Sequence, residues 1–421
     1  MRFSQLQSGL ESQTTVLFIL DGLANGIDFA FHFWMGRVLI PSDFAILQTL
    51  NSVMLVYTTA SGVFQPVVGR FVAEARGTGQ SGSIPAIFQT FLRATFGLGV
   101  ILAILILLLS EVIAQTLNLP GWTIRISAGL IFLSTLRPIA AGVLQGQEDF
   151  ISFGLSRLAL SLGRISLVFF LVQAGFGLTG AVIALPFGWF VSLLCAFLLL
   201  KKSLWVRSTP RHGLLRAGWK LSFYALLAYI AYMSLTSLDL VWVNRNLEGE
   251  LAGAYASLVL LRRVVALLPG VAVTVMFPRI AKTLAEGRPP DHLLARTAAI
   301  ILGAGGTLTL LYFIVGDQLI RIVFGEAYRA ASPLLGWMGL AMVGVSLSSI
   351  WLNYYLAERP RNFVILLGTA VLLEWLLLNL LPVSLPSAVL AFGGTGWLLS
   401  FGGLLLYSFS NRRLLRPSAS Q

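Results

Sequence analysis

Polar side chains recur at helical spacing in the first apolar stretch of the chain. They are Asp21, Asn25, Asp28 and His32, at steps of 4, 3 and 4 residues. Those steps place all four side chains on one face of a helix. Ionisable groups inside membrane helices mark ion pathways and proton relays, so this face is a candidate site for a cation or a proton.

A similar set of side chains recurs in the second half of the chain. It consists of Tyr229, Tyr232, Thr236 and Asp239. At an offset of 211 residues, Asp28 falls on Asp239. A carboxylate facing lipid is costly, so we expect both faces to line a hydrated cavity, together with the stretches 44–69 and 252–275. Asp28, Asp239 and Asp21 are the expected ion-coupling residues.

Hydrogen bonding between helices is the alternative role for these side chains. Asn25 and Thr236 fit either role. His32 is expected to be a hydrogen-bonding partner, with a proton relay as the alternative.

Two adjacent arginines, Arg262 and Arg263, stand within the apolar stretch 252–275. In a cavity their guanidinium groups would bind phosphate, because the planar fork meets phosphate oxygens bidentately. The alternative is that they reach the membrane surface or pair with an acid such as Asp239.

Arg164 and Glu374 occupy equivalent positions of the two halves, at an offset of 210 residues. Their opposite charges suggest that they face each other as an interlock between the halves. A double mutant that exchanges the two charges would recover function only if they pair.

The composition indicates which elements position these side chains. Of the 421 residues, 57% are apolar and 11% are charged, against about 25% charged in a soluble domain. A transmembrane helix needs about 20 mostly apolar residues, so the apolar content suits about twelve helices. This excludes a soluble enzyme, a nucleic-acid-binding domain and a disordered chain.

Twelve apolar spans are expected, six in each half. They are 15–37, 44–69, 87–109, 122–143, 153–174, 178–200, 221–243, 252–275, 296–316, 331–356, 362–381 and 385–408. The predicted fold is all-α and polytopic, with six-helix bundles at 1–200 and 221–421, a basic cytoplasmic linker at 201–220 and a cavity between the bundles. With cytoplasmic termini, inner segments hold 21 of the 29 Lys and Arg residues, including Arg137 and Arg157, and outer loops hold five. This split follows the positive-inside rule and explains the net charge of +12 without an anionic partner.

The sequence contains no motif for catalysis, cofactor binding or metal binding in the structural context that such a motif requires. Residues 175–180 match G-x-G-x-x-G, but they form a turn between two apolar spans without a strand–helix unit. The chain contains no P-loop, and its three histidines lack metal-ligand spacing. We therefore expect no enzyme activity, no cofactor and no metal.

Five short segments carry a resemblance to a known family. They are residues 36–44, 144–150, 177–181, 276–280 and 324–331. In their order and spacing the chain resembles the multidrug/oligosaccharidyl-lipid/polysaccharide exporter (MOP) superfamily, especially its polysaccharide-transporter (Wzx-like) branch. The resemblance implies a 6+6 helical flippase that moves polyprenyl-pyrophosphate-linked oligosaccharide across the inner (plasma) membrane by alternating access.

The resemblance also suggests substrate-binding residues. Arg263 precedes Pro269 and Gly270 much as a basic residue of helix eight does in lipid II flippases, and Arg37 matches a basic residue at the end of helix one. Arg262 is expected to assist them. Asn51 stands where those flippases carry basic residues in helix two, and this difference argues against a peptidoglycan precursor as cargo.

The implied partners are a lipid-linked oligosaccharide, membrane lipid, and the polymerase and glycosyltransferases of polysaccharide synthesis, with no nucleic acid. A cation-coupled drug antiporter of the same superfamily is the alternative.

Overall fold

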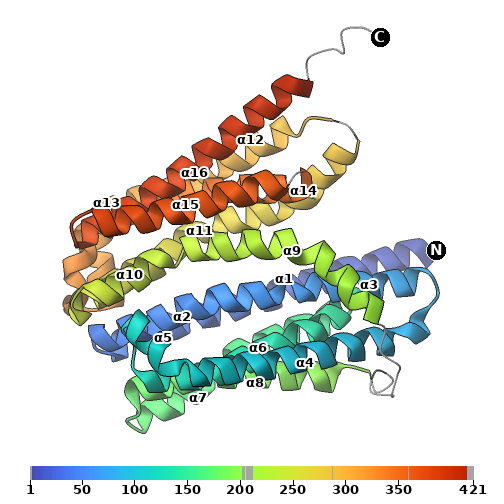
Figure 1. The fold of residues 1–421 in the computed structure, drawn as a ribbon, viewed down its shortest axis with the longest axis horizontal. Coiled ribbons are helices and arrows are strands. Elements are labelled where there is room, and N and C mark those ends of the chain that lie inside the picture. The colour runs from blue at the N-terminus through green and yellow to red at the C-terminus, as the bar shows by residue number, and fades with distance from the viewer. Residues whose placement is uncertain (1, 202–203, 205–211, 287, 359, 415–421) are drawn as a thin grey trace. The chain divides into compact units, whose positions relative to one another are not determined.

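The structure is a computed structural model that describes residues 2–201, 204, 212–286, 288–358 and 360–414. These residues form helices and turns, without a strand, and Figure 1 shows the helices in chain order. The first half contains α1 (Arg2–Val38), α2 (Pro41–Gly62), α3 (Phe64–Gly77), η1 (Ser81–Ser83), α4 (Ile84–Leu108), α5 (Ser110–Leu117), α6 (Gly121–Gly146), α7 (Phe150–Gln173) and α8 (Gly177–Leu199). The second half contains α9 (His212–Leu235), α10 (Leu238–Asn246), α11 (Gly249–Ala285), α12 (Asp291–Ile300), η3 (Ile301–Gly305), α13 (Gly306–Val323), η4 (Glu326–Leu334), α14 (Leu335–Glu358), α15 (Pro360–Leu380) and α16 (Leu385–Leu414).

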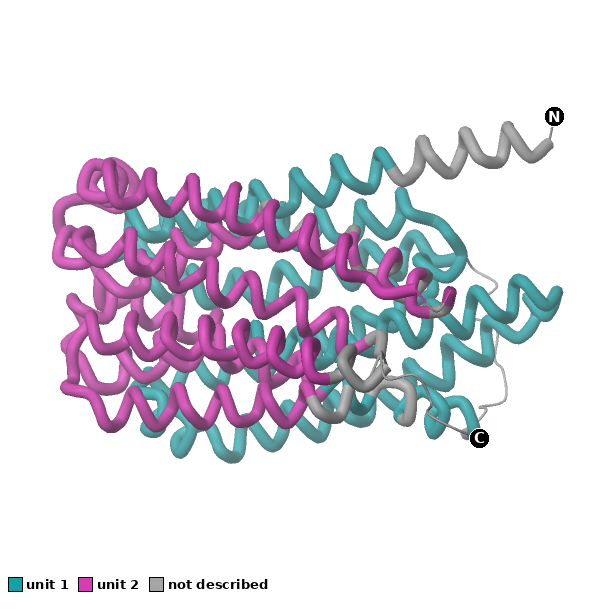
Figure 2. Tube along the Cα trace, turned by 90° about the horizontal axis from the view of Figure 1, so that it is seen from above, with its two compact units in different colours: residues 1–39, 54–226 teal, residues 40–53, 227–421 magenta. Residues whose placement is uncertain are grey.

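The chain divides into two compact units, which Figure 2 colours separately. Unit 1 comprises residues 1–39 and 54–226, and unit 2 comprises residues 40–53 and 227–421. The start of α2 therefore belongs to the second unit, whereas the expected division at 201–220 places all of α2 in the first bundle. Linker residues 202–203 and 205–211 lie outside the described residues. The remainder of the expected linker, from His212 onward, is the first part of α9.

Each of the twelve expected spans falls on helix within the described residues. Nine helical segments of that part of the chain are long and apolar enough to cross a membrane. They are Thr15–Val38, Ser81–Leu108, Gly121–Gly146, Phe150–Gln173, Gly177–Leu199, Asp291–Val323, Glu326–Leu356, Phe363–Leu380 and Leu385–Phe409. A tenth arises if the bent pair α9–α10 counts as one span. The all-α polytopic fold is thus confirmed, and the number twelve stays a prediction.

The two most enclosed helices are α6 in unit 1 and α14 in unit 2. In each, 78% of the most apolar window is buried, against 17–50% in the other seven candidate spans. Their first residues, Gly121 and Leu335, are separated by nearly the same offset as the repeat in the sequence. Each unit is therefore built around an equivalent inner helix, and its outer helices turn large apolar side chains such as Leu108 and Leu380 outward, as lipid contact requires.

Close packing of α3 against α6 depends on glycine. A Cβ atom on Gly142 would lie 2.6 Å from the Gln65 carbonyl oxygen, and one on Gly146 would lie 2.5 Å from that of Gly69. Small residues four apart allow helix backbones to approach in a membrane without an apolar driving force. This contact fixes α6, which carries one of the buried arginines described below.

Candidate functional site: charged side chains within the helices

An ion pair between α1 and α7 contains Asp28, the first of the predicted coupling residues. Arg164 Nη1 donates to Asp28 Oδ1 at 2.5 Å, and His32 Nε2 lies 4.0 Å from Asp28 Oδ2. The Arg164 guanidinium also lies over the ring of Phe31, 5.4 Å from its centroid. The Arg164 side chain is 8% exposed and that of Asp28 is 39% exposed. The carboxylate is therefore paired and still accessible.

A second polar group lies further toward the N-terminus on the same face of α1. Arg157 of α7 forms an ion pair with Asp21 and donates from Nη2 to Asn25 Oδ1 at 3.1 Å. Asn25 in turn donates to Asp21 Oδ2 at 3.3 Å. Since Arg157 and Arg164 are seven residues apart on one face of α7, the shared face predicted for α1 is confirmed, and α7 is its partner.

Arg137, expected in an inner segment, is a buried arginine of α6. Its Nε donates to Ser192 Oγ at 2.8 Å, and Ser192 donates onward to the Ser156 carbonyl at 2.6 Å. Its guanidinium lies 5.9 Å from the ring centroid of Trp189. Among the described residues, no carboxylate lies within ion-pair distance of Arg137 and no acceptor bonds its terminal nitrogens. The serine hydroxyl and the tryptophan ring therefore fix the orientation of this buried guanidinium.

Replacing Arg137 with methionine is expected to leave the melting temperature of the purified protein unchanged or to raise it. A buried charge without a counter-ion is a cost that an apolar side chain of similar length removes. Polysaccharide export should nevertheless fall, because the donors for an anion are lost. A clear drop in melting temperature for Arg137→Met, with export intact, would instead make Arg137 a structural residue.

The corresponding ion pair of unit 2 is more deeply buried. Arg262 of α11 binds both carboxylate oxygens of Asp239, with Nη2 3.0 Å from Oδ1. Tyr255 donates its hydroxyl to Asp239 Oδ2 at 2.7 Å, and the Arg262 guanidinium stacks 3.9 Å from the ring centroid of Phe392. Asp239 and Tyr255 are fully buried and Arg262 is 2% exposed. The interpretation that Arg262 pairs with Asp239 is therefore confirmed.

The helix breaks beside this pair. The segments Phe223–Leu235 and Leu238–Asn246 meet at an angle of 42°, so the continuous helix face expected over residues 229–239 is interrupted. The break leaves the carbonyl of Thr236 outside the helical pattern, and Arg262 Nη2 donates to that oxygen at 2.7 Å. Arg262 thus satisfies a backbone acceptor that a regular helix would have bonded itself.

Glu374 of α15 lies close to the same group and is fully buried. Neither of its carboxylate oxygens has a hydrogen-bond partner within the described part of the chain. Asp239, Arg262 and Tyr255 are the titratable groups that act on it electrostatically. The predicted interlock of Glu374 with Arg164 would join the two units and stays a prediction, while Arg164 has Asp28 as its partner within unit 1.

The remaining predicted substrate-binding residues are more accessible than Arg262. Arg263 is half-buried and donates from Nη2 to Ser52 Oγ at 3.3 Å. Asn51, next to Ser52 on α2, is half-buried, and Arg37 is exposed in the last turn of α1. Arg263 and Ser52 stand at the repeat offset of 211 residues, so the two equivalent positions contact each other.

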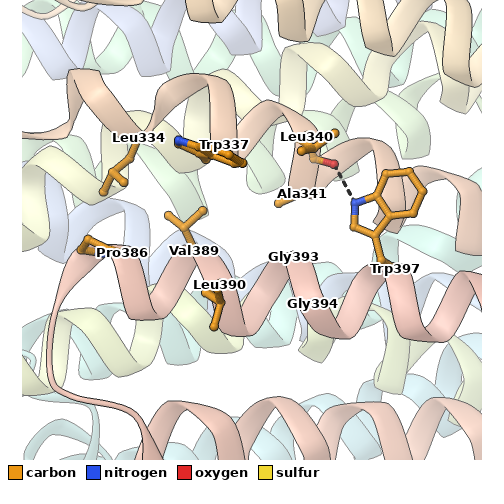
Figure 3. A pocket seen from close by; sticks show the side chains of 10 residues that line it. All are labelled: Leu334, Trp337, Leu340, Ala341, Pro386, Val389, Leu390, Gly393, Gly394 and Trp397. Carbon is orange, nitrogen blue, oxygen red and sulfur yellow. Dashed lines mark hydrogen bonds between the residues drawn. The ribbon is translucent and has the colours of Figure 1, made fainter.

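Apolar pockets lie on the surface of unit 2, apart from the charged groups. Figure 3 shows one of about 410 Å³ between α14 and α16, lined by residues that include Trp337, Leu390 and Trp397. Trp397 donates from Nε1 to the Leu340 carbonyl at 3.2 Å. Trp397 also lines a second pocket, of about 380 Å³, between α12, α14 and α16. The lining of the first pocket is apolar and suits a hydrocarbon chain, whereas the lining of the second also includes Asp291, Ser400 and Tyr407.

The fold and these charged groups define a multi-pass helical membrane protein in which arginine–aspartate pairs connect neighbouring helices. The chain belongs to the polysaccharide biosynthesis protein family, whose sequence profile matches residues 11–284, more than half of its length. No curated protein matches the chain by sequence.

Solved structures of MOP superfamily transporters share this fold. An inward-facing multidrug resistance MATE family transporter of that superfamily aligns with a TM-score of 0.78 at 14% identity, over 93% of this chain and 96% of its own. The eukaryotic MATE transporter AtDTX14 aligns with a TM-score of 0.63 at 13% identity, over 95% and 96%. A MOP superfamily transporter from Pyrococcus furiosus aligns with a TM-score of 0.57 at 15% identity, over 95% and 94%. The MATE-like fold expected from the resemblance is thus confirmed.

Proposed function

We propose that this chain is a flippase that moves polyprenyl-pyrophosphate-linked oligosaccharide across the inner membrane for polysaccharide export. Membership of the polysaccharide biosynthesis family supports the sugar part of this cargo. The MATE-like fold supports transport by alternating access. Both termini would then be cytoplasmic, and the polymerase and glycosyltransferases of the pathway would be the partners.

The observation that carries the proposal is the presence of arginine side chains at membrane depth that are positioned for an anion. Arg137 offers unbonded donors in unit 1, and Arg263 of unit 2 is half-buried on a serine hydroxyl. A pyrophosphate carries the charge that guanidinium groups bind bidentately. Arg37 and Asn51 would contribute further donors. Arg262 would assist indirectly, since its guanidinium is bonded to Asp239.

The proposed coupling residues are Asp28, Asp239 and Asp21. Each of these carboxylates forms an ion pair with an arginine. A cation or proton that reaches the carboxylate would therefore compete with the arginine for it. The cation or proton would then bind more tightly to the conformation in which the carboxylate is not paired with arginine. Such a difference in affinity between two conformations is what shifts a conformational equilibrium.

The test is a flipping assay in liposomes. Purified protein is reconstituted with a fluorescent polyprenyl-pyrophosphate disaccharide, and an impermeant quencher reports the fraction of headgroups in the outer leaflet. We expect quenching beyond the outer-leaflet fraction only in protein-containing liposomes. A matched polyprenyl alcohol without pyrophosphate should not be flipped. Gradient-driven uptake of a cationic dye, without flipping, would favour the drug antiporter instead.

A further inference from the structure

The buried charges of unit 2 do not balance if both of its inner carboxylates are ionised. Asp239 and Glu374 contribute two negative charges, and Arg262 contributes one positive charge. All three side chains are 2% exposed or less. A net negative charge on deeply buried side chains is strongly disfavoured, so the group requires one more cation.

The hydrogen bonds show which carboxylate lacks a cation. Asp239 receives both terminal nitrogens of Arg262 and the hydroxyl of Tyr255. The other contacts of Arg262 go to the Thr236 carbonyl, the Met338 sulfur and the ring of Phe392. These hydrogen bonds therefore end on Asp239, on a backbone carbonyl or on a thioether sulfur. Glu374 receives none from the described residues.

We propose that Glu374 binds a proton and is the proton-binding site of unit 2. A protonated carboxyl group is neutral, so it tolerates a buried position with few hydrogen bonds far better than a carboxylate does. With Glu374 protonated, Arg262 and Asp239 form a balanced pair.

The helices around Glu374 supply no other charge at this depth. Helix α15 packs on α10, α14 and α16. The described side chains of α14 and α16 include no charged residue, and α10 contributes Asp239. Arg262 and Tyr255 of α11 complete the titratable groups that act on Glu374. Titration of Glu374 therefore depends on these three groups.

A proton fits the site better than a metal cation. A hard cation needs about six oxygen ligands, whereas the oxygens of Asp239 are already bonded to Arg262 and Tyr255. The guanidinium would also repel a second positive ion. Within the described residues, no group of three or more His, Cys, Asp and Glu side chains could hold a metal.

Comparison of the repeats indicates what the proton would control. The position of Glu374 is occupied in unit 1 by Arg164, which forms an ion pair with Asp28. Loss of the Glu374 proton would create a second carboxylate that competes with Asp239 for Arg262. In unit 1 the equivalent residue, Arg164, is an arginine and cannot change in this way. This inference rests on the proposed flippase function and adds Glu374 of unit 2 to the proposed coupling residues as a proton-binding group.

Infrared difference spectroscopy on the purified full-length protein tests proton binding directly. We expect the C=O band of a protonated, buried carboxylic acid near neutral pH, with the small shift in D₂O that a carboxyl group shows. The band should vanish in Glu374→Gln and in Glu374→Leu, either of which keeps the site neutral. Glu111→Gln is the matched control, because Glu111 is exposed and paired with Arg125. A band that persists in folded Glu374→Gln, or that disappears in Asp239→Asn instead, overturns the assignment.

Flipping in the liposome assay under an imposed pH gradient tests the coupling. Wild type should respond to the gradient, and Glu374→Gln should lose that response. If the spectral band is lost but the gradient response is unchanged, the assignment of coupling to Glu374 is wrong. If wild type does not flip the lipid at all, the proposed function fails, and the spectral result on Glu374 stands independently.

Discussion

Replacing Arg262 with methionine is expected to lower the stability of the protein by about 3–5 kcal/mol, the usual cost of removing one partner of a buried ion pair. The loss would leave Asp239 fully buried with the Tyr255 hydroxyl as its one side-chain donor among the described residues. It would also leave the Thr236 carbonyl without its arginine bond. Thermal unfolding of the purified protein in detergent, followed by tryptophan fluorescence, measures the effect.

Two further variants make this prediction specific. Arg125→Met breaks an ion pair with Glu111 whose side chains are 57% and 61% exposed, so its cost should be at most about 1 kcal/mol. The double variant Arg262→Met/Asp239→Leu removes both charges and should recover much of the loss. If Arg262→Met unfolds at the same temperature as Arg125→Met, the buried pair does not hold unit 2 together.

Replacing Arg263 with alanine is expected to weaken substrate binding by about 2 kcal/mol, roughly 30-fold, which is the scale of a hydrogen bond to a charged group. Polysaccharide export at normal expression should fall accordingly. Arg263→Lys keeps the charge and loses the planar fork, so its export should lie between alanine and wild type.

The controls for Arg263 separate phosphate binding from packing. Ser52→Ala removes the hydroxyl that accepts from Arg263 and should cost less than Arg263→Ala, because the guanidinium remains. Arg329→Ala removes an exposed arginine that pairs with Asp317 and should leave export near wild type. Export by Arg263→Ala at the wild-type level would falsify the phosphate-binding role.

The periodicity of polar residues predicted local geometry well. The steps between Asp21, Asn25 and Asp28 placed them on one face of α1, and both arginines that meet them come from one face of α7. Apolar stretches likewise located the helices, because about 20 apolar residues are needed to cross the bilayer. These features depend on short-range spacing, which a sequence displays directly.

The features that were not predicted depend on contacts distant in sequence. Arg137 was placed in an inner segment because arginine is usually interfacial, and its serine partner lies 55 residues away. The break beside Thr236 has no proline or glycine to announce it, since the sequence there is Leu235-Thr236-Ser237. An arginine from the next helix satisfies the freed carbonyl, and spacing alone does not reveal such a partner.

The break between α9 and α10 also has a consequence for biogenesis. The second segment is too short to cross the bilayer alone, since it has 9 residues, and it carries Asp239 in its first turn. Insertion scales assign an unpaired aspartate at the centre of a helix about 3 kcal/mol. The translocon would therefore release this span poorly until Arg262 has emerged from the ribosome, so that α9, α10 and α11 partition into lipid as one cooperative hairpin.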